Sequence, residues 1–489
     1  MLASVALAVG MLFLGASLGG MDAIRKAKAQ TASARPNFVF ILTDDMRKDD
    51  LAFMPKTRSL LEGRGMSFQN ALVSHALCAP SRATIMRGQY AHNTHVSSNS
   101  STDSPSTSFG GWQAYRRNGD ETDNVATRLN GAGYRTGLFG KYMNRYGNTT
   151  HVPRGWDRWF AASSLGDPEY FDYDVNDDGT VKHFGTSESD YMTDVLSRKT
   201  NEFIAGSASL GAPFFAYVAP IAPHAPATPA PRDRHAFDGV SGPRLSSFDE
   251  GDVSDKPSWI RKLPRLTASK ISEIDNRHEK RVESLQAVDD LVAGVVGTLR
   301  DAGALGNTYV FFTSDNGFHH GEHRIPQQKW RPYEEDVRVP LLVRGPGVAV
   351  GPATSRLALN TDYMPTFTDL ACSSVSPCDT QNWSYVPDGR TLEPVLHGGV
   401  TTTWRSAVLL EAAAHYTPAY KGIRTVNTDA SPKRKYVEYR DGPRELYGLD
   451  PDPHERTNVY RSGSPPSALT ARLRELKGCA GNACRRAEN

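Results

Sequence analysis

Runs of consecutive apolar residues recur along the chain, and each run ends in polar residues. The clearest runs are residues 37–42, 134–139, 214–218 and 308–312. Runs without polar alternation are typical of strands that are covered on both faces. The pattern therefore predicts an α/β fold.

Helical patterns lie between these runs. Apolar residues from Leu285 to Leu299 repeat at helical spacing, and residues 301–303 end the helix just before the next strand. Asn124 occupies the position of a helix cap ahead of a second apolar pattern. Strands that alternate with helices predict a large, mostly parallel sheet flanked by helices.

Polar residues at the ends of the predicted strands indicate where a site would form. In open α/β sheets, ligands bind in the crevice beyond the carboxyl ends of the strands. The candidates for one shared site at that edge are Asp44, Asp45, Lys141, His224, Asp315 and Asn316.

The last hundred or so residues have a different pattern. Residues 407–411 and 435–439 are short strand-like stretches, the second followed by an Asp-Gly turn, and a closing helix is expected near residues 469–476. We expect a smaller antiparallel sheet here. The predicted organisation is an N-terminal segment (1–34), a large catalytic domain (35–395) and a small C-terminal subdomain (396–489).

The N-terminal segment is typical of an export signal. Residues 2–20 carry no charge, and an A-x-A pattern follows at residues 27–29. Cleavage is favoured, but the apolar run is close to a minimal membrane span, so an uncleaved anchor is the alternative. We expect a secreted or periplasmic protein, or a lysosomal one if the source is eukaryotic.

Net charge and cysteine content limit which partners the chain can bind and which roles its cysteines can have. The formal charge of +2, from 56 basic and 54 acidic residues, does not favour binding to nucleic acid or to an anionic membrane surface. Of five cysteines, Cys372 with Cys378 and Cys479 with Cys484 form the simplest of three pairings in an oxidising compartment. Cys78 is left over, as a buried structural thiol or as a reactive residue.

Cys78 begins the stretch Cys-Ala-Pro-Ser-Arg, which ends at Arg82. Pro80 is suited to the first turn of a helix, so Cys78 is expected at a helix N-terminus, where partial positive charge favours an anion. Taken alone, the stretch also fits a small buried cysteine at a junction between a loop and a helix.

The stretch resembles the C-x-P-S-R signature of the sulfatases, in which the cysteine is oxidised to formylglycine. Residues 37–45 resemble the first strand and metal-binding Asp pair of that family, and residues 313–317 resemble its second metal-binding segment. Residues 140–144 and 222–224 resemble its sulfate-contacting segments. Within the family, the similarity is greatest to N-acetylglucosamine-6-sulfatases.

This resemblance implies a fold of the alkaline-phosphatase type and a mechanism. Arg82 would steady a hydrated aldehyde at Cys78, Lys141 and Lys329 would hold the sulfate, and His224 would bind sulfate or assist the leaving group. The ligands Asp44, Asp45, Asp315 and Asn316, beside residue 78, offer oxygen atoms that favour a hard cation, Ca²⁺ or Mg²⁺, over Zn²⁺. The resemblance implies one Ca²⁺.

One position departs from the family pattern. Many sulfatases have histidine two positions after the lysine that matches Lys141, whereas this chain has Met143. The base that deprotonates the second hydroxyl is therefore open, with His319 and His320 as candidates. Residues 174–179 are similar to the start of an EF-hand calcium loop, but the glutamate that ends such a loop is missing. A hairpin turn between Tyr173 and Val181 is therefore predicted instead.

The predicted activity is hydrolysis of a sulfated carbohydrate or aryl sulfate, after maturation by a formylglycine-generating enzyme. A phosphodiesterase or phosphonate monoester hydrolase is the nearest alternative, because related enzymes use the same oxidised cysteine. A non-catalytic, calcium-dependent glycan-binding protein is the alternative from another class.

Overall fold

The computed structural model describes residues 35–100, 110–147, 149–165, 169–351, 353–372, 383–399, 404–415, 417–427 and 432–489. The predicted export signal in residues 1–34, and Cys378, lie outside these ranges. Within the described ranges, no helix combines the length and the apolar character that crossing a membrane requires.

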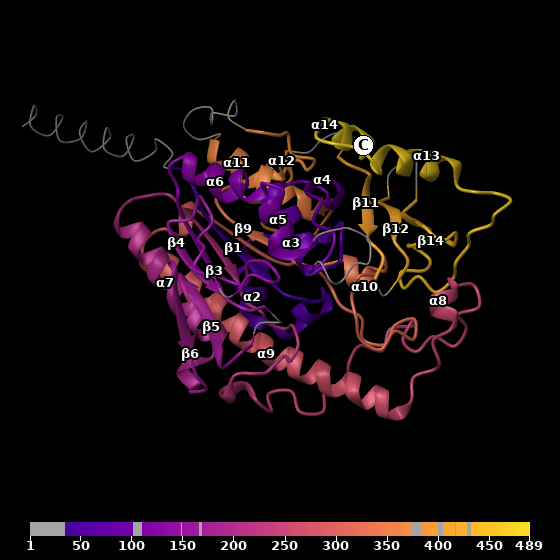
Figure 1. Cartoon of the computed structure of the whole chain (residues 1–489), viewed down its shortest axis with the longest axis horizontal. Helices are drawn as coiled ribbons and strands as arrows, with labels where there is room; N and C mark the ends of the chain where they lie inside the picture. The colour runs from indigo at the N-terminus through magenta and orange to yellow at the C-terminus, as the bar shows by residue number, and fades with distance from the viewer. Residues whose placement is uncertain are drawn as a thin grey trace, which may run out of the picture.

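A ten-stranded sheet runs through the molecule (Figure 1) in the order β10-β2-β9-β8-β1-β7-β3-β4-β5-β6. The strands are β1 (Asn37–Thr43), β2 (Met66–Leu72), β3 (Arg135–Gly140), β4 (Arg158–Ala162), β5 (Tyr173–Asp177), β6 (Thr180–Phe184), β7 (Phe214–Ala219), β8 (Thr308–Ser314), β9 (Leu341–Arg344) and β10 (Thr354–Leu359). Neighbours from β8 to β4 are parallel, as are β10 and β2, whereas β9, β5 and β6 run antiparallel to their neighbours. The predicted mostly parallel sheet and the β5–β6 hairpin are confirmed.

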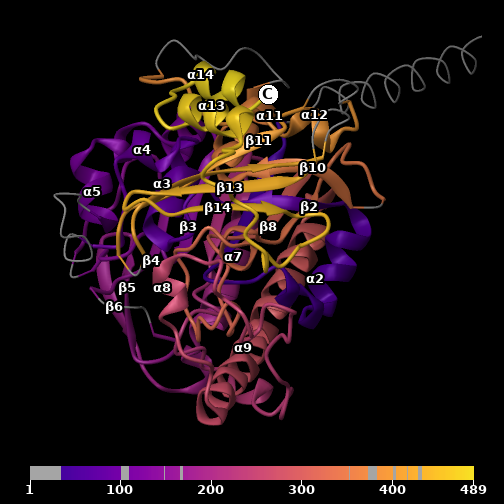
Figure 2. The same ribbon diagram turned by 90° about the vertical axis from the view of Figure 1, so that its right-hand side faces the viewer.

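Strand β1 is buried on both faces because its side chains alternate between two cores. Phe38, Phe40 and Leu42 pack into one cluster, which includes residues of α3 (Cys78–Arg87) and α11 (Tyr363–Cys372). Val39 and Ile41 pack into the other, with residues of α7 (Met192–Ser209) and α9 (Ala268–Asp301). Figure 2 shows the sheet between these helices. The run of apolar residues reflects this double coverage.

Helix α9 confirms the predicted helix but begins well before it. It spans 34 residues, and the Thr267 side chain caps its start by accepting a hydrogen bond from the Lys270 amide at 3.2 Å. Its first half is rich in charged residues and lacks the apolar repeat from which the helix was predicted. Asn124 caps α6 (Val125–Gly131), as expected, by accepting from the Ala126 amide at 2.9 Å.

The remaining helices are short and lie mostly in connections. They are α2 (Pro55–Leu60), α4 (Ala91–Thr94), α5 (Gly111–Arg117), α8 (Ser258–Arg261), α10 (Glu334–Val337), α12 (Glu393–Leu396), α13 (Ser467–Leu476) and α14 (Asn482–Ala487).

A second, four-stranded antiparallel sheet lies near the C-terminus, as predicted. Its strands in order are β11 (Ala407–Ala412), β12 (Tyr420–Thr425), β13 (Arg434–Tyr439) and β14 (Arg444–Gly448), with α13 beside it. The Glu411 amide of β11 donates to the Ser74 carbonyl at 2.8 Å, which joins this sheet to the large one. The predicted disulfide between Cys479 and Cys484 is present.

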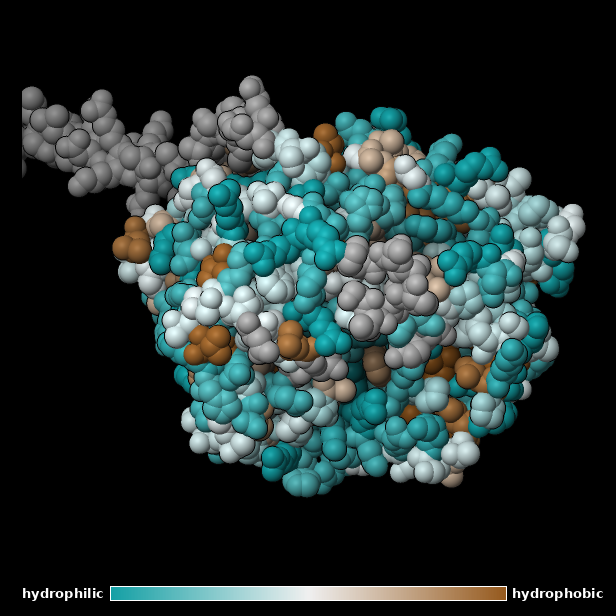
Figure 3. Space-filling view, in the orientation of Figure 1, coloured by the Kyte–Doolittle hydropathy of each residue, from teal (hydrophilic) through white to brown (hydrophobic). Residues whose placement is uncertain are grey.

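The surface is mainly hydrophilic on the face that Figure 3 shows, with a small share of hydrophobic residues, some of which lie near one another at the lower right. Among the described residues, the large exposed hydrophobic ones are Leu165, Val181, Leu210, Val350, Val386 and Val459, which come from different segments. Scattered apolar residues of this kind are ordinary on protein surfaces and do not indicate a docking face.

Candidate active site

Helix α3 presents Cys78 at its first position. Leu77 precedes it in an extended conformation, and Gly88 ends the helix with a left-handed φ of 64°. Every residue of the helix is buried, and Cys78 is 0% exposed. The structure therefore confirms the expected position of Cys78 at a helix N-terminus.

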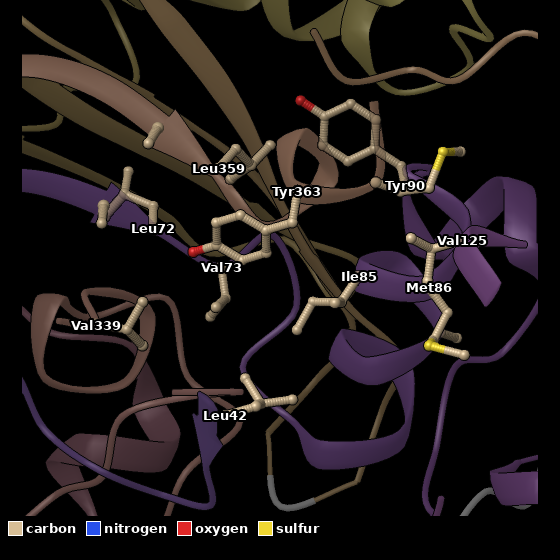
Figure 4. Packing of buried hydrophobic residues seen from close by; sticks show 14 of the residues in the cluster. Leu42, Leu72, Val73, Ile85, Met86, Tyr90, Val125, Val339, Leu359 and Tyr363 are labelled. Carbon is tan, nitrogen blue, oxygen red and sulfur yellow. The ribbon is translucent and has the colours of Figure 1, made fainter. Parts of the chain in front are cut away.

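Packing against three other elements fixes the helix in place. Figure 4 shows Ile85 and Met86 of α3 in one hydrophobic cluster with Leu42 of β1, Leu72 of β2 and Tyr363 of α11. Because close-packed side chains have little freedom to shift, the start of α3 is held at the carboxyl end of β1.

The two acidic segments meet at the ends of β1 and β8. These strands are parallel neighbours, with Thr43 opposite Ser314, so the residues that follow them converge. The Asp45 amide donates to Asp315 Oδ1 at 3.1 Å, and Asn316 Nδ2 donates to Asp45 Oδ1 at 2.7 Å. Asp45 adopts a left-handed φ of 67°, which is uncommon for residues other than glycine, although aspartate tolerates it better than most.

Cys78 faces this acidic pair. Its Sγ lies 3.3 Å from Asp44 Oδ1, and Lys329 Nζ donates to the same sulfur at 2.8 Å. One candidate ligand atom from each of Asp44, Asp45, Cys78 and His224 lies within 4.8 Å of the others. Segments far apart in the sequence thus meet around residue 78.

Positive side chains surround the carboxylates. Arg82 Nε donates to Asp315 Oδ2 at 2.8 Å, and Arg82 Nη1 donates to the Lys141 carbonyl at 2.7 Å. The ammonium group of Lys141 contacts the Asp44 carboxylate, and that of Lys329 contacts the Asp45 carboxylate. All nine predicted site residues therefore lie in one cluster, which is buried except for the partly exposed Lys329.

His224 is oriented by its own loop. Its Nδ1 donates to the Ala225 carbonyl at 2.7 Å, which leaves Nε2 without the ring proton when the imidazole is neutral. That Nε2 lies 3.8 Å from Asp45 Oδ2. The ring is thus held with its second nitrogen toward the acidic cluster.

The charges set the protonation states. Burial raises the pKa of Asp44, but the nearby cations, Lys141 first, outweigh it and hold the pKa well below its usual value. Burial and the charge of Asp44 raise the pKa of Asp315 to about 6. Burial, followed by Asp44, raises the pKa of the Cys78 thiol. Asp44 is therefore ionised, whereas an unmodified Cys78 is a protonated and poor nucleophile.

A pocket of about 500 Å³ opens onto this cluster. Asp45, His224 and Lys329 line it, together with residues that sequence analysis did not assign to the site: Leu77, Asn99, Asn144, Arg145, Leu165, Ala225, Arg277, Phe318, Gln327, Gln328, Trp330 and His415. The rings of Trp330 and His415 stack at 4.7 Å with an interplanar angle of 26°. Asn144 lies within a recognised motif, and Leu77, Ala225 and Phe318 adjoin others. Arg277 and His415, in contrast, carry no signal in the sequence.

The candidates for the unassigned catalytic base, and Met143, lie outside the lining of this pocket. His319 and His320 are fully buried and are not among the residues that line the pocket. His319 Nδ1 bonds Asp336 Oδ1 at 2.5 Å, and Met143 packs in the hydrophobic core. Of the pocket-lining residues, His224 and His415 carry imidazoles.

The ligand atoms at the acidic cluster fit a hard divalent cation. Asp44, Asp45, Asp315 and Asn316 offer oxygen atoms, as Ca²⁺ and Mg²⁺ prefer. Asn316 Oδ1 is buried and finds no hydrogen-bond partner among the described residues. An acceptor buried without a partner is costly, and a bound cation would satisfy it.

Comparison with known proteins agrees with this arrangement. The family described as Sulfatase matches residues 36–373, and the family described as N-sulphoglucosamine sulphohydrolase, C-terminal, matches residues 321–477. The chain belongs to the sulfatase family. It is similar to human N-acetylglucosamine-6-sulfatase, with 33% identity over 97% of this chain and 89% of the relative. It is also similar to an arylsulfatase of Volvox carteri, with 32% identity over 93% of this chain and 76% of the relative.

Solved structures share the fold of this sulfatase. One, described as a complex with its substrate D-glucosamine-2-N,6-O-disulfate, has a TM-score of 0.73 at 24% identity, covering 91% of this chain and 97% of that one. A phosphonate monoester hydrolase of Agrobacterium radiobacter has a TM-score of 0.65 at 22% identity, covering 91% and 95%. The expected fold of the alkaline-phosphatase type is confirmed, and at these identities the likeness concerns the fold alone.

Proposed function

We propose that this sulfatase removes sulfate from a sulfated amino sugar, with N-acetylglucosamine 6-sulfate in glycosaminoglycans as the substrate class. Its nucleophile would be formylglycine made from Cys78, and its cofactor one Ca²⁺. The observation that carries the proposal is the position of Cys78 at the start of α3, with Lys329 Nζ at 2.8 Å and Asp44 Oδ1 at 3.3 Å from its sulfur.

Asp44, Asp45, Asp315 and Asn316 would hold the Ca²⁺ beside residue 78. When bound, the ion would supply Lewis-acid chemistry, holding a sulfate oxygen and lowering the pKa of the attacking hydroxyl. The unpartnered Asn316 Oδ1 and the convergence of the two strand ends support this ligand set.

Maturation would convert the thiol carbon of Cys78 into an aldehyde. This is a two-electron oxidation in which the carbon gains oxygen and loses sulfur, and a formylglycine-generating enzyme would supply the oxidant. Hydration of the aldehyde places two hydroxyl groups on one carbon. The oxygen of one attacks sulfur as the sugar alcohol leaves, and deprotonation of the other then expels sulfate and restores the aldehyde. The second step is intramolecular, so it needs no ordered water.

The cations of the cluster would stabilise the charge that develops on the sulfate oxygens. Lys141 contacts Asp44 and Lys329 contacts Asp45, and each would hold the sulfate. Arg82 is anchored to Asp315 at 2.8 Å and would steady the hydrated aldehyde. The Nε2 of His224 is directed to the same region, and in the protonated imidazolium it would donate to sulfate or give a proton to the leaving alcohol.

The pocket suits a sugar rather than an extended apolar ligand. Asn144, Arg145 and Gln328 provide hydrogen-bonding groups around its wall, and the stacked rings of Trp330 and His415 offer an aromatic surface. The names of the relatives point to the same substrate class. An exported location, as the N-terminal segment predicts, would bring the enzyme to such polysaccharides.

The first experiment is peptide mass spectrometry across residue 78 of the active protein. A mass that corresponds to replacement of the thiol carbon by an aldehyde supports formylglycine, whereas an unmodified thiol in fully active enzyme refutes it. Cys78→Ser should lose turnover while sulfated sugar still binds, because serine cannot form the second hydroxyl. If Cys78→Ser binds the sugar but the wild type also shows no turnover, the glycan-binding alternative holds instead.

Substrate preference separates the remaining alternatives. N-acetylglucosamine 6-sulfate, an aryl sulfate and an aryl phosphate diester should be compared by kcat/KM on the same preparation. The sulfated sugar should be preferred, and faster turnover of the phosphate diester would favour the phosphodiesterase alternative.

A further inference from the structure

A second cluster of possible metal ligands lies close to the active-site loops. It consists of Asp50, His278 and His320, which come from the segment after β1, from α9 and from the segment after β8. One candidate ligand atom of each lies within 4.8 Å of the other two, and all three residues are buried. The proposed mechanism uses none of them.

Several polar atoms in this cluster have no partner among the described residues. They are Asp50 Oδ1, His278 Nδ1 and both ring nitrogens of His320. Asp50 Oδ2, in contrast, accepts from the Arg47 amide at 3.0 Å. An unsatisfied buried polar group costs about 1–3 kcal/mol. Because the unpartnered atoms belong to three adjacent side chains, a single shared ligand would satisfy them together.

The protonation states suit a cation. Burial lowers the pKa of His278 to about 4 and, together with the nearby arginines, lowers that of His320 as well. Both imidazoles are therefore neutral at pH 7, which is their metal-binding form. The nearby positive charges are already engaged, because Arg47 pairs with Glu322 at 2.9 Å and Arg281 pairs with Asp50 Oδ2 at 3.5 Å.

We propose that Asp50, His278 and His320 bind a divalent transition-metal ion of the Zn²⁺ class, at a site separate from the acidic cluster beside Cys78. Two imidazole nitrogens, one carboxylate oxygen and a solvent molecule are a common tetrahedral ligand set for zinc. Ligand atoms around such an ion lie about 3.4 Å apart, so the side chains must close by at most about 1.4 Å.

The site would tie together the segments that carry the calcium ligands. Asp50 follows the acidic pair of β1, and His320 follows Asn316 after β8, while His278 belongs to the long helix that runs past both. A bound ion would stabilise the folded protein by an amount that grows with the logarithm of the free ion concentration above its Kd, because the unfolded chain does not hold these ligands together.

The test is the metal content of the full-length protein after equilibration with both Zn²⁺ and Ca²⁺. The wild type and a control, His183→Gln at an exposed histidine, should each retain one zinc per chain. His278→Gln should weaken zinc binding by roughly 100-fold or more, because second-shell changes alone cost 10–100-fold. Its calcium content should stay unchanged. A wild type that binds no zinc overturns the proposal, as does equal zinc retention by His278→Gln.

Cobalt substitution of the wild type provides a second measurement that does not depend on the folding of a variant. Visible absorption typical of tetrahedral Co²⁺, without a sulfur-to-metal charge-transfer band, supports a site made of nitrogen and oxygen ligands. The weak absorption of six-coordinate Co²⁺ alone would place the ion among the oxygen ligands beside residue 78 and would overturn the proposal.

Discussion

Arg281 offers a sharp test of how the fold positions the site. It is 1% exposed, on α9, and its guanidinium binds two loop backbones at once. Arg281 Nη2 donates to the Asp45 carbonyl at 2.5 Å, and Nη1 donates to the Pro223 carbonyl at 3.0 Å. The first loop carries the acidic pair and the second carries His224. Replacement by methionine keeps most of the volume and removes every donor.

The contacts that Arg281→Met removes set the expected magnitude. Two buried carbonyl groups lose a charged donor, and Asp50 loses the partner that lies 3.5 Å from its Oδ2. Removing one partner of a buried charged pair costs about 3–5 kcal/mol, and we expect the free energy of unfolding to fall by that amount. Asp45 is held at a φ of 67°, so it should relax when this bond is lost. A ligand displaced by about 1 Å can lower kcat up to about 100-fold.

The assay combines urea unfolding with steady-state kinetics on a sulfated substrate. Arg300→Met, at an exposed position near the end of the same helix, is the matched control. Arg281→Met should unfold at lower urea and lose kcat with little change in KM, whereas Arg300→Met should behave as the wild type. If stability falls but kcat does not, Arg281 supports the fold alone and the positioning argument is wrong.

Three further predictions concern the metal, the pocket and pH. Asn316→Ala should weaken Ca²⁺ binding and lower activity, with partial rescue at high Ca²⁺, as calcium titration of activity would show; unchanged affinity would exclude this ligand. Trp330→Ala should raise KM for a sulfated sugar more than for a small aryl sulfate, and equal effects would argue against stacking. Burial lowers the pKa of His92, but its bond to Glu411 raises the pKa above the usual value. The interaction between His92 and Glu411 therefore makes its full contribution to the free energy of unfolding below about pH 6.5, and this contribution falls as the pH rises through the raised pKa. The unfolding free energies of wild type and His92→Gln should therefore converge at alkaline pH.

Much of the large sheet was predictable because double burial leaves a direct mark on sequence. Strand β1 must be apolar at every position, since its alternate side chains enter different cores. Strands β2 and β10 were not predicted. The partly buried β2 mixes polar and apolar residues, and β10 begins with polar ones, so neither has a continuous apolar run.

The convergence of the candidate ligands was also predictable, because they stand at strand ends and in local motifs. Asp44 and Asp315 follow paired parallel strands, so convergence follows from topology alone. The pocket wall was not predictable in this way. Arg277 and His415 reach the pocket from α9 and from the segment after β11, and nothing local in the sequence relates them to Cys78.

Arg281 shows why the supporting residues escape sequence reasoning. Its partners at the site are backbone carbonyl groups, which every residue has, so no pairing of residue types marks the contact. Asp45 lies 236 positions away along the chain, and the contact exists only because α9 packs across the end of the sheet. A motif can specify which side chains gather at the candidate site. How firmly they are held depends on a buried cation whose role becomes visible only when the helix and both loops are placed together.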